Sequence, residues 1–269
     1  MTVSPQWMKA CCADAYGSDV VALLLGESYH PGGAALTRRL ADQIGLLGLD
    51  QIGALSRVAD IACGRGATAR LLAGEYHVSV DGVDASAMNI SHARAAASQG
   101  QLQQRLRFHH GDAEELPLPD TAFDALVCEC AFCTFPDKKA AADEFTRILR
   151  PGGCAGIADV TVTDAGLPAE LTTFAARIAC IADARTVSDY TALLARAGLQ
   201  VARIESHDHA LLGMIDRIEA RITALRIAAP AMLADHGVQP DAVLAYARLA
   251  RDTVEAGQIG YALIVADKP

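Results

Sequence analysis

The sequence predicts an α/β fold in which helices cover both faces of a doubly wound, mostly parallel sheet. Two observations predict it. Short apolar runs alternate with helical patterns from residue 56 onward, and a run such as 123–130 is apolar almost throughout. Strands that are buried on both faces of a parallel sheet have this composition, and alternation with helices is typical of βαβ units.

The elements are expected in a fixed order along the chain. Strands are predicted at 57–63, 78–84, 106–110, 123–130, 154–160, 199–206 and 260–266. Helical patterns begin at 67 and 86 and cover 137–149, 188–197 and most of 210–256, and Pro151-Gly152-Gly153 is a predicted turn. We therefore expect an N-terminal helical cap at 1–55 and a larger domain at 56–269 with a helical insertion at about 210–256.

Composition and charge limit the classes of partner. The 269 residues include 23 Lys+Arg against 32 Asp+Glu, for a formal net charge of −9. This balance argues against binding to nucleic acid or to an anionic lipid surface. No stretch reaches the roughly 20 apolar residues of a membrane helix, and residues 1–10 have no basic flank leading into an apolar core, so no signal peptide is expected there. We expect a cytoplasmic protein, a monomer or homodimer, that acts on a small molecule.

Acidic and glycine residues stand at the ends of the first three predicted strands. The segment 60–66 (DIACGRG) lies where the first strand turns into a helix, Asp84 ends the second strand, and Asp112 follows the third. Glycines let the backbone approach a ligand at a helix N-terminus, and carboxylates can accept from ribose hydroxyls or an adenine amino group. With no matching phosphate cluster, this pattern indicates a nucleoside without phosphates.

The motifs DIACGRG, VDGVDAS, FHHGDAEELP, FDALVCEC and LRPGG, over roughly residues 56–160, resemble the class I S-adenosylmethionine-dependent methyltransferases. The resemblance implies that family's doubly wound fold and S-adenosyl-L-methionine as cofactor. The cofactor-binding residues that it implies are Asp60, Cys63, Gly64 and Gly66 near the methionine end, Asp84 and Ala85 at the ribose, Asp112 and Ala113 at the adenine, and Cys128 in the pocket wall. Ala62 stands where the family usually has glycine.

The eight cysteines are too few for a disulfide scaffold and are expected to stay thiols. Ala10-Cys11-Cys12, Cys130 ahead of Pro136-Asp137-Lys138, and Cys180 ahead of a helix together resemble the arsenite S-adenosylmethionine methyltransferases, over roughly residues 10–200. That resemblance implies a trivalent arsenical as acceptor, free or as a thiol conjugate. Its catalytic thiolates would be Cys130, Cys180 and one of Cys11 or Cys12, with Cys12 preferred, because thiolates suit soft trivalent arsenic.

Other interpretations stay open. The family's Tyr-Gly-Cys-Gly segment is replaced here by LGESYHPGG at 25–33, which removes one redox-active cysteine. A small organic metabolite could be the acceptor, with O-, N- or C-methylation and with Tyr29, His30 or His109 as base. A non-catalytic thiol-rich sensor is a third hypothesis. No resident metal is predicted, because the CxCxxC pattern at 128–133 lacks a second paired half. Glu129 is a possible neighbour of the cofactor's sulfonium charge.

Overall fold

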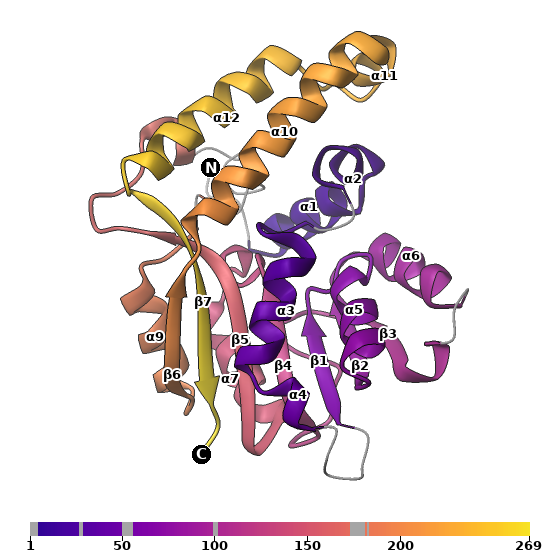
Figure 1. Cartoon of the computed structure of the whole chain (residues 1–269), viewed down its shortest axis with the longest axis vertical. Helices are drawn as coiled ribbons and strands as arrows, with labels where there is room; N and C mark the ends of the chain where they lie inside the picture. Colours follow the sequence, from indigo (N-terminus) through magenta and orange to yellow (C-terminus); the bar gives the residue numbers. More distant parts are fainter. Residues whose placement is uncertain (1–4, 27–28, 50–55, 99–101, 173–180, 182) are drawn as a thin grey trace.

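The structure, a computed structural model, describes residues 5–26, 29–49, 56–98, 102–172, 181 and 183–269. Within these residues a seven-stranded sheet has the strand order β3-β2-β1-β4-β5-β7-β6 (Figure 1). The strands are β1 (Arg57–Ile61), β2 (Ser79–Asp84), β3 (Leu106–His110), β4 (Phe123–Glu129), β5 (Leu149–Val162), β6 (Gln200–Ser206) and β7 (Ile259–Asp267). Strands β1 to β5 pair in parallel, and β7 is antiparallel to both β5 and β6. The predicted doubly wound, mostly parallel α/β fold is confirmed.

Helices surround this sheet and extend beyond one end of it (Figure 1). Those before the sheet are α1 (Pro5–Gly17), α2 (Asp19–Leu25), α3 (Gly33–Gln43) and α4 (Leu46–Leu49). Those between strands are α5 (Ala67–Glu75), α6 (Ala87–Ser98), α7 (Lys138–Ile148) and α9 (Val187–Arg196), with short 3₁₀ turns η2 (Gln103–Arg105), η3 (Phe132–Thr134) and η4 (Ala169–Thr172). Finally, α10 (Asp208–Ala228), α11 (Pro230–Asp235) and α12 (Pro240–Glu255) form a projecting arm between β6 and β7. We propose that this arm is the insertion and that α1–α4 form the cap.

Local sequence signals place several helix starts. The side chain of Ser18 accepts a hydrogen bond from the amide of Val21 at the start of α2, and Asp137 does the same for Ala140 at the start of α7. Such caps satisfy amide groups that have no partner within the helix. Once formed, the helices bury apolar side chains against the sheet, with Phe132 and Phe145 fully buried. Each such burial contributes about 1.5–3 kcal/mol.

The predicted turn at Pro151-Gly152-Gly153 is wrong. These residues lie inside β5, which starts at Leu149. Pairing with β4 shifts register between Phe123 and Ala125, so the segment is a strand irregularity. Long-range pairing outweighs the local turn signal, because the amide of Gly152 donates to the carbonyl of Lys268 at 2.8 Å.

The topology brings the carboxyl ends of β1 to β4 to one edge of the sheet. In a parallel α/β sheet, ligands bind outside that edge, near the point where the strand order reverses. Here the reversal lies between β1 and β4. None of the described helices is both long and apolar enough to cross a bilayer.

Candidate active site

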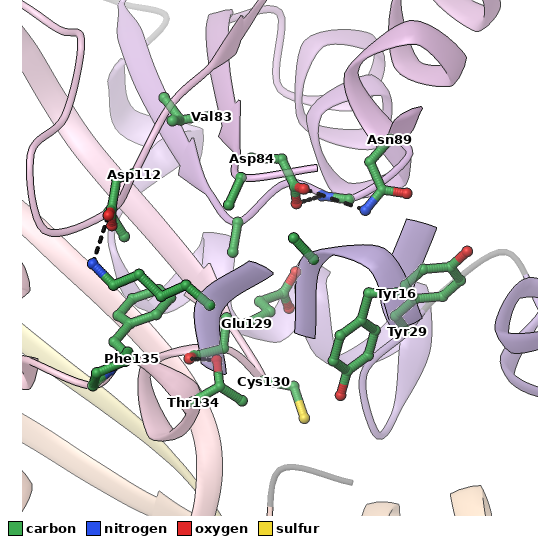
Figure 2. A pocket seen from close by; sticks show the side chains of 18 residues that line it. Tyr16, Tyr29, Val83, Asp84, Asn89, Asp112, Glu129, Cys130, Thr134 and Phe135 are labelled. Carbon is green, nitrogen blue, oxygen red and sulfur yellow. Dashed lines mark hydrogen bonds and ion pairs between the residues drawn. The ribbon is translucent and has the colours of Figure 1, made fainter. Parts of the chain in front are cut away.

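A pocket opens at the carboxyl ends of β1 to β4, under α1 (Figure 2). Its volume is about 130 Å³, and its walls include the predicted residues Gly64, Asp84, Ala85, Asp112 and Ala113. A second, smaller cavity of about 60 Å³ lies behind the glycine turn. It contains the predicted residues Asp60, Cys63 and Gly64, and the two cavities share Tyr29, Ala62, Gly64 and Glu129. The structure thus brings most of the predicted cofactor residues together.

The glycine turn between β1 and α5 depends on left-handed backbone conformations. Gly64 has φ of 53° and Gly66 has φ of 76°. A Cβ on Gly66 would lie 2.8 Å from the ring of Phe108, so this position also needs the missing side chain. Ala62, which stands in place of the family's glycine, has φ of 58°, a conformation unusual for a residue with a side chain. The turn is therefore retained with alanine at position 62, at the cost of backbone strain at that residue.

Asp84 is positioned as a hydrogen-bond acceptor at the end of β2. Its carboxylate accepts from the amides of Gly64 and Ser86, each at 2.8 Å, and from the Asn89 side chain at 3.2 Å. Burial raises the pKa of Asp84, although these donors oppose the shift. Asn89 lines the pocket with its amide nitrogen directed at Asp84, and its amide oxygen is buried without a hydrogen-bond partner (Figure 2). The Asp84 carboxylate offers acceptors for the hydroxyls of a ribose.

Three residues that line the smaller cavity each have a buried polar atom without a hydrogen-bond partner. These are Oδ2 of Asp60, Nε of Arg65 and the hydroxyl of Tyr29. Buried polar groups normally have partners, so each of these atoms suggests a ligand. An amino-acid head group would satisfy all three, since Asp60 can accept from its ammonium while Arg65 and Tyr29 donate to its carboxylate. The residues present therefore fit the methionine end of S-adenosylmethionine.

Glu129 lines both cavities. Its carboxylate accepts from the hydroxyls of Thr68 at 2.6 Å and Thr37 at 3.1 Å, and it lies 3.4 Å from Nε2 of His30. Its side chain is only 5% exposed, so water screens a charge on this carboxylate poorly and its interactions with nearby groups are strong. Burial raises the pKa of nearby Asp60 well above its usual range, with further contributions from Glu129 and Asp84. This concentration of carboxyl groups favours a cationic ligand.

Helix α1 contacts Asp112 in the wall of the pocket. Nζ of Lys9 donates to Asp112 at 2.5 Å and also pairs with Glu114 (Figure 2). Burial lowers the pKa of Lys9, but the hydrogen bonds to these carboxylates outweigh it and the net pKa is raised. Lys9, Ala13 and Tyr16 line the pocket with the i, i+4, i+7 spacing of one helix face. Sequence reasoning missed Lys9 and Arg65, because their partners Asp112 and Asp19 are distant along the chain. It also missed Asn89, although its partner Asp84 is only five residues away.

The predicted cysteines are distributed unevenly. Cys130 lines the pocket, with φ of 53°. Cys128 is fully buried in β4 and is not a lining residue, nor is Gly66; burial raises the pKa of the Cys128 and Cys63 thiols well above the ordinary value. Cys11 does not line the pocket, and helix geometry places it on the face of α1 opposite Lys9 and Ala13. The side chain of Cys12 and all of Cys180 lie outside the described residues.

Of the three candidate bases, two lie at the cavities and one does not. Tyr29 and His30 lie at the cavities, whereas Nε2 of His109 is 2.9 Å from Asp81 and lines none of them. Burial raises the pKa of Tyr29, so its hydroxyl remains a donor. Within the described part of the chain, no group of three or more His, Cys, Asp or Glu side chains has an arrangement suited to a metal ion.

A large apolar chamber adjoins the cofactor pocket. It has a volume of about 530 Å³ and shares Tyr16, Tyr29 and Cys130 with the pocket. Figure 2 shows Cys130 and the ring of Tyr16 at the same side of the pocket. The rings of Tyr16 and Tyr29 lie 6.2 Å apart, centre to centre. A molecule in the chamber would therefore meet the cofactor at this junction, which consists of Tyr16, Tyr29 and Cys130.

Comparison with known proteins agrees with this geometry. The family described as "Methyltransferase domain" matches residues 58–153. The chain is 31% identical over 193 residues to the 27-O-demethylrifamycin SV methyltransferase of Amycolatopsis mediterranei, covering 68% of this chain and 70% of that protein. It is 31% identical over 154 residues to the arsenite methyltransferase of Halobacterium salinarum, covering 56% of this chain but 39% of that protein.

The fold is also shared with solved structures. A phosphoethanolamine N-methyltransferase 2 from Haemonchus contortus superposes with a TM-score of 0.81 at 17% identity, over 100% of this chain and 60% of that one. The chain belongs to the class I S-adenosylmethionine-dependent methyltransferases. Its methyl donor is S-adenosyl-L-methionine.

Proposed function

We propose that this protein transfers a methyl group from S-adenosylmethionine to a small organic acceptor. The observation that carries the proposal is the junction, where the cofactor pocket and the apolar chamber share Tyr16, Tyr29 and Cys130. A methyl transfer needs the two reactants in contact and in line, and holding them so accounts for much of an enzyme's rate advantage. A shared wall between two cavities provides that arrangement.

Each part of the pocket has a proposed task. Asp84 and Asn89 orient the ribose, Asp112 the adenine, and Asp60 with Arg65 the amino-acid end. When bound, S-adenosylmethionine supplies a methyl group activated by its sulfonium. For a hydroxyl acceptor, the oxygen forms a bond to the methyl carbon, the carbon–sulfur bond breaks with its electron pair left on sulfur, and the hydroxyl proton passes to water. The products are a methyl ether, S-adenosylhomocysteine and a proton.

The relatives support an organic acceptor over an arsenical. The relative that is matched over 70% of its own length is named for a rifamycin derivative, an organic molecule, whereas the arsenite methyltransferase is matched over 39% of its length. The chamber adds a physical argument, because an arsenite ion needs thiolates and not an apolar volume of about 530 Å³. The organic acceptor is therefore the proposed function.

An arsenical acceptor is the second candidate, and Cys130 favours it. This thiol lies at the junction, next to where the methyl group would be delivered. Trivalent arsenic needs two or three thiolates, and Cys11 lies on the wrong face of α1 to help. The candidate then depends on Cys12 and Cys180 joining Cys130.

One experiment separates the two. The purified, reduced protein is incubated with S-adenosylmethionine and either arsenite with glutathione or a panel of hydroxylated apolar compounds. Mass spectrometry then measures S-adenosylhomocysteine and the methylated product. We expect turnover on members of the organic panel and no methylated arsenic in wild type. Methylated arsenic that disappears in Cys130→Ser, with no organic product, would instead establish the arsenical. Calorimetric binding of S-adenosylhomocysteine to both proteins shows that the cofactor site is intact.

A further inference from the structure

We infer that the chamber selects an uncharged, elongated acceptor with a mainly apolar body, and that Ala247 and Ala250 of α12 set how much of that body fits. This inference rests on the proposed function and adds the substrate class to it.

The walls are apolar faces of three helices that come from opposite ends of the chain. On α10, Leu211, Met214, Ile215 and Ile218 follow the i, i+3, i+4, i+7 spacing of a single face. The walls from α12 and α2 continue this surface with Ala242, Val243, Tyr246, Ala247, Ala250, Val254, Val21, Leu24 and Leu25. Apolar helix faces normally pack against each other. Here they surround a volume, so lining side chains lack the contacts that a close-packed interior provides.

Charge is excluded from this volume. Among the described residues that line the chamber there is no Asp, Glu, His, Lys or Arg. An ion buried without a partner is strongly unfavourable, so phosphorylated, carboxylated or ammonium-bearing acceptors are poor ligands here. Three ion pairs of the arm lie among residues that do not line the chamber: Arg251 contacts Asp216 and Glu219, and Arg226 contacts Asp241.

The size and shape of the chamber point to an elongated molecule. Its volume of about 530 Å³ is within the roughly 300–1,000 Å³ of small-molecule sites. Lining residues on α12 run from Ala242 to Val254, which corresponds to roughly 18 Å at 1.5 Å per residue. The chamber meets the cofactor pocket at the junction. The acceptor atom must therefore lie at the junction, with the apolar body extending along α12.

Small side chains keep the middle of the α12 wall open. Ala247 and Ala250 are 6% and 5% exposed and lie one helical turn apart on the lining face. A leucine at either position would project three more carbon atoms into the chamber. Ala245 is on the same helix but is exposed and does not line the chamber, so Ala245→Leu is a matched control.

The test uses two fluorescent probes with one carbon skeleton, the neutral 1-pyrenebutanol and the anionic 1-pyrenebutyrate, titrated into full-length protein with S-adenosylhomocysteine at pH 7.5. We expect 1-pyrenebutanol to bind at one site, at least tenfold more tightly than 1-pyrenebutyrate. Ala247→Leu and Ala250→Leu should each weaken it about tenfold, and Ala245→Leu should leave it unchanged. Equal binding of the two probes, or no effect of either lining variant, would overturn the inference.

Cofactor binding is measured separately in every variant by calorimetry with S-adenosylhomocysteine. Unchanged affinity, together with an unchanged melting temperature, shows that a lining variant has folded and that its effect is confined to the chamber. A wild-type protein that binds 1-pyrenebutanol but not S-adenosylhomocysteine would refute the proposed function and leave the chamber assignment standing. The two failures are therefore distinguishable.

Discussion

Two buried carboxylates on β2, Asp81 and Asp84, have different roles. Asp84 accepts hydrogen bonds from the glycine turn and lines the cofactor pocket. Asp81 pairs with Arg57 and His109 at 3.0 Å and 2.9 Å and lines neither cofactor cavity. Both residues lie on β2, but only Asp84 ends the strand at the binding edge.

This pair gives the first prediction. Asp84→Asn should weaken S-adenosylhomocysteine binding roughly 10–100-fold, since a hydrogen bond to a charged group contributes about 1.5–3 kcal/mol. Isothermal titration calorimetry measures the change. Asp81→Asn is the control, and it should reduce stability while leaving the affinity within about twofold. Equal effects of the two substitutions on affinity would mean that Asp84 acts only through the fold.

Asp60 gives a second prediction, on pH. Burial and the neighbouring carboxylates raise its pKa well above the usual range. Folding therefore favours the protonated form, and Asp60 makes the cofactor-free protein less stable as pH rises from its unfolded value of about 3.9 toward the raised folded value. A cationic ammonium next to Asp60 reverses this preference, so cofactor binding should release a proton.

Two measurements test this linkage. Titration calorimetry in buffers of different ionisation enthalpy should show proton release in wild type, with affinity rising with pH across the range in which Asp60 ionises. Asp60→Asn should abolish that release and weaken binding. In the absence of cofactor it should stabilise the protein at neutral pH, because an amide does not have to take up a proton on folding. An Asn variant that is less stable than wild type at neutral pH would refute the argument.

At the scale of elements, the β1–α5 turn determines whether the pocket forms. Gly66→Ala combines left-handed strain of about 1–2 kcal/mol with a contact 2.8 Å from Phe108, for which overpacking adds about 1–3 kcal/mol. Gly152→Ala has nearly the same φ, 75°, with nothing within 4 Å, so it reports the strain alone. Urea unfolding should show the larger loss for Gly66→Ala, and its cofactor affinity should also fall. Equal losses would show that the Phe108 contact is readily relieved.

The whole molecule shows how far sequence reasoning can reach. The carboxylates at Asp60, Asp84 and Asp112 were predictable, because each ends or follows a strand and parallel topology brings such ends together. The chamber was not, because the apolar faces of α2 and α10 are separated by about 190 residues of chain and periodicity does not reveal which face stays uncovered. For the same reason the cysteine pattern was ambiguous: spacing alone did not show that Cys11 faces away from the pocket while Cys130 faces it.

One contact joins the cap to the arm across that separation. Nη1 of Arg221 on α10 donates to the carbonyl of Leu24 at the end of α2, at 2.9 Å. The guanidinium lies against Gly26, where an added Cβ would be 2.5 Å from Nη2 of Arg221. Gly26 also has φ of 86°, so a side chain there adds backbone strain as well as displacing Arg221. Leu24 lines the chamber, which makes this contact part of the structure that holds the chamber together.

A double-mutant cycle measures how much the Arg221 contact with α2 contributes to stability. Gly26 has φ of 86° and ψ of −151°, a backbone region that essentially only glycine adopts. Gly26→Ala should therefore cost backbone strain plus the Arg221 hydrogen bond, whereas in an Arg221→Met background only the strain remains. The two substitutions should therefore be non-additive in urea unfolding by about 0.5–1.5 kcal/mol, the range for one hydrogen bond. Gly45→Ala, at another positive φ of 75° with nothing within 4 Å, should cost the same in both backgrounds. Additive losses for Gly26 and Arg221 would mean that cap and arm are held together by apolar packing alone. In that case Gly26→Ala would leave the binding of 1-pyrenebutanol unchanged. If the Arg221 contact does hold cap and arm together, we expect Gly26→Ala to weaken 1-pyrenebutanol binding without changing the affinity for S-adenosylhomocysteine.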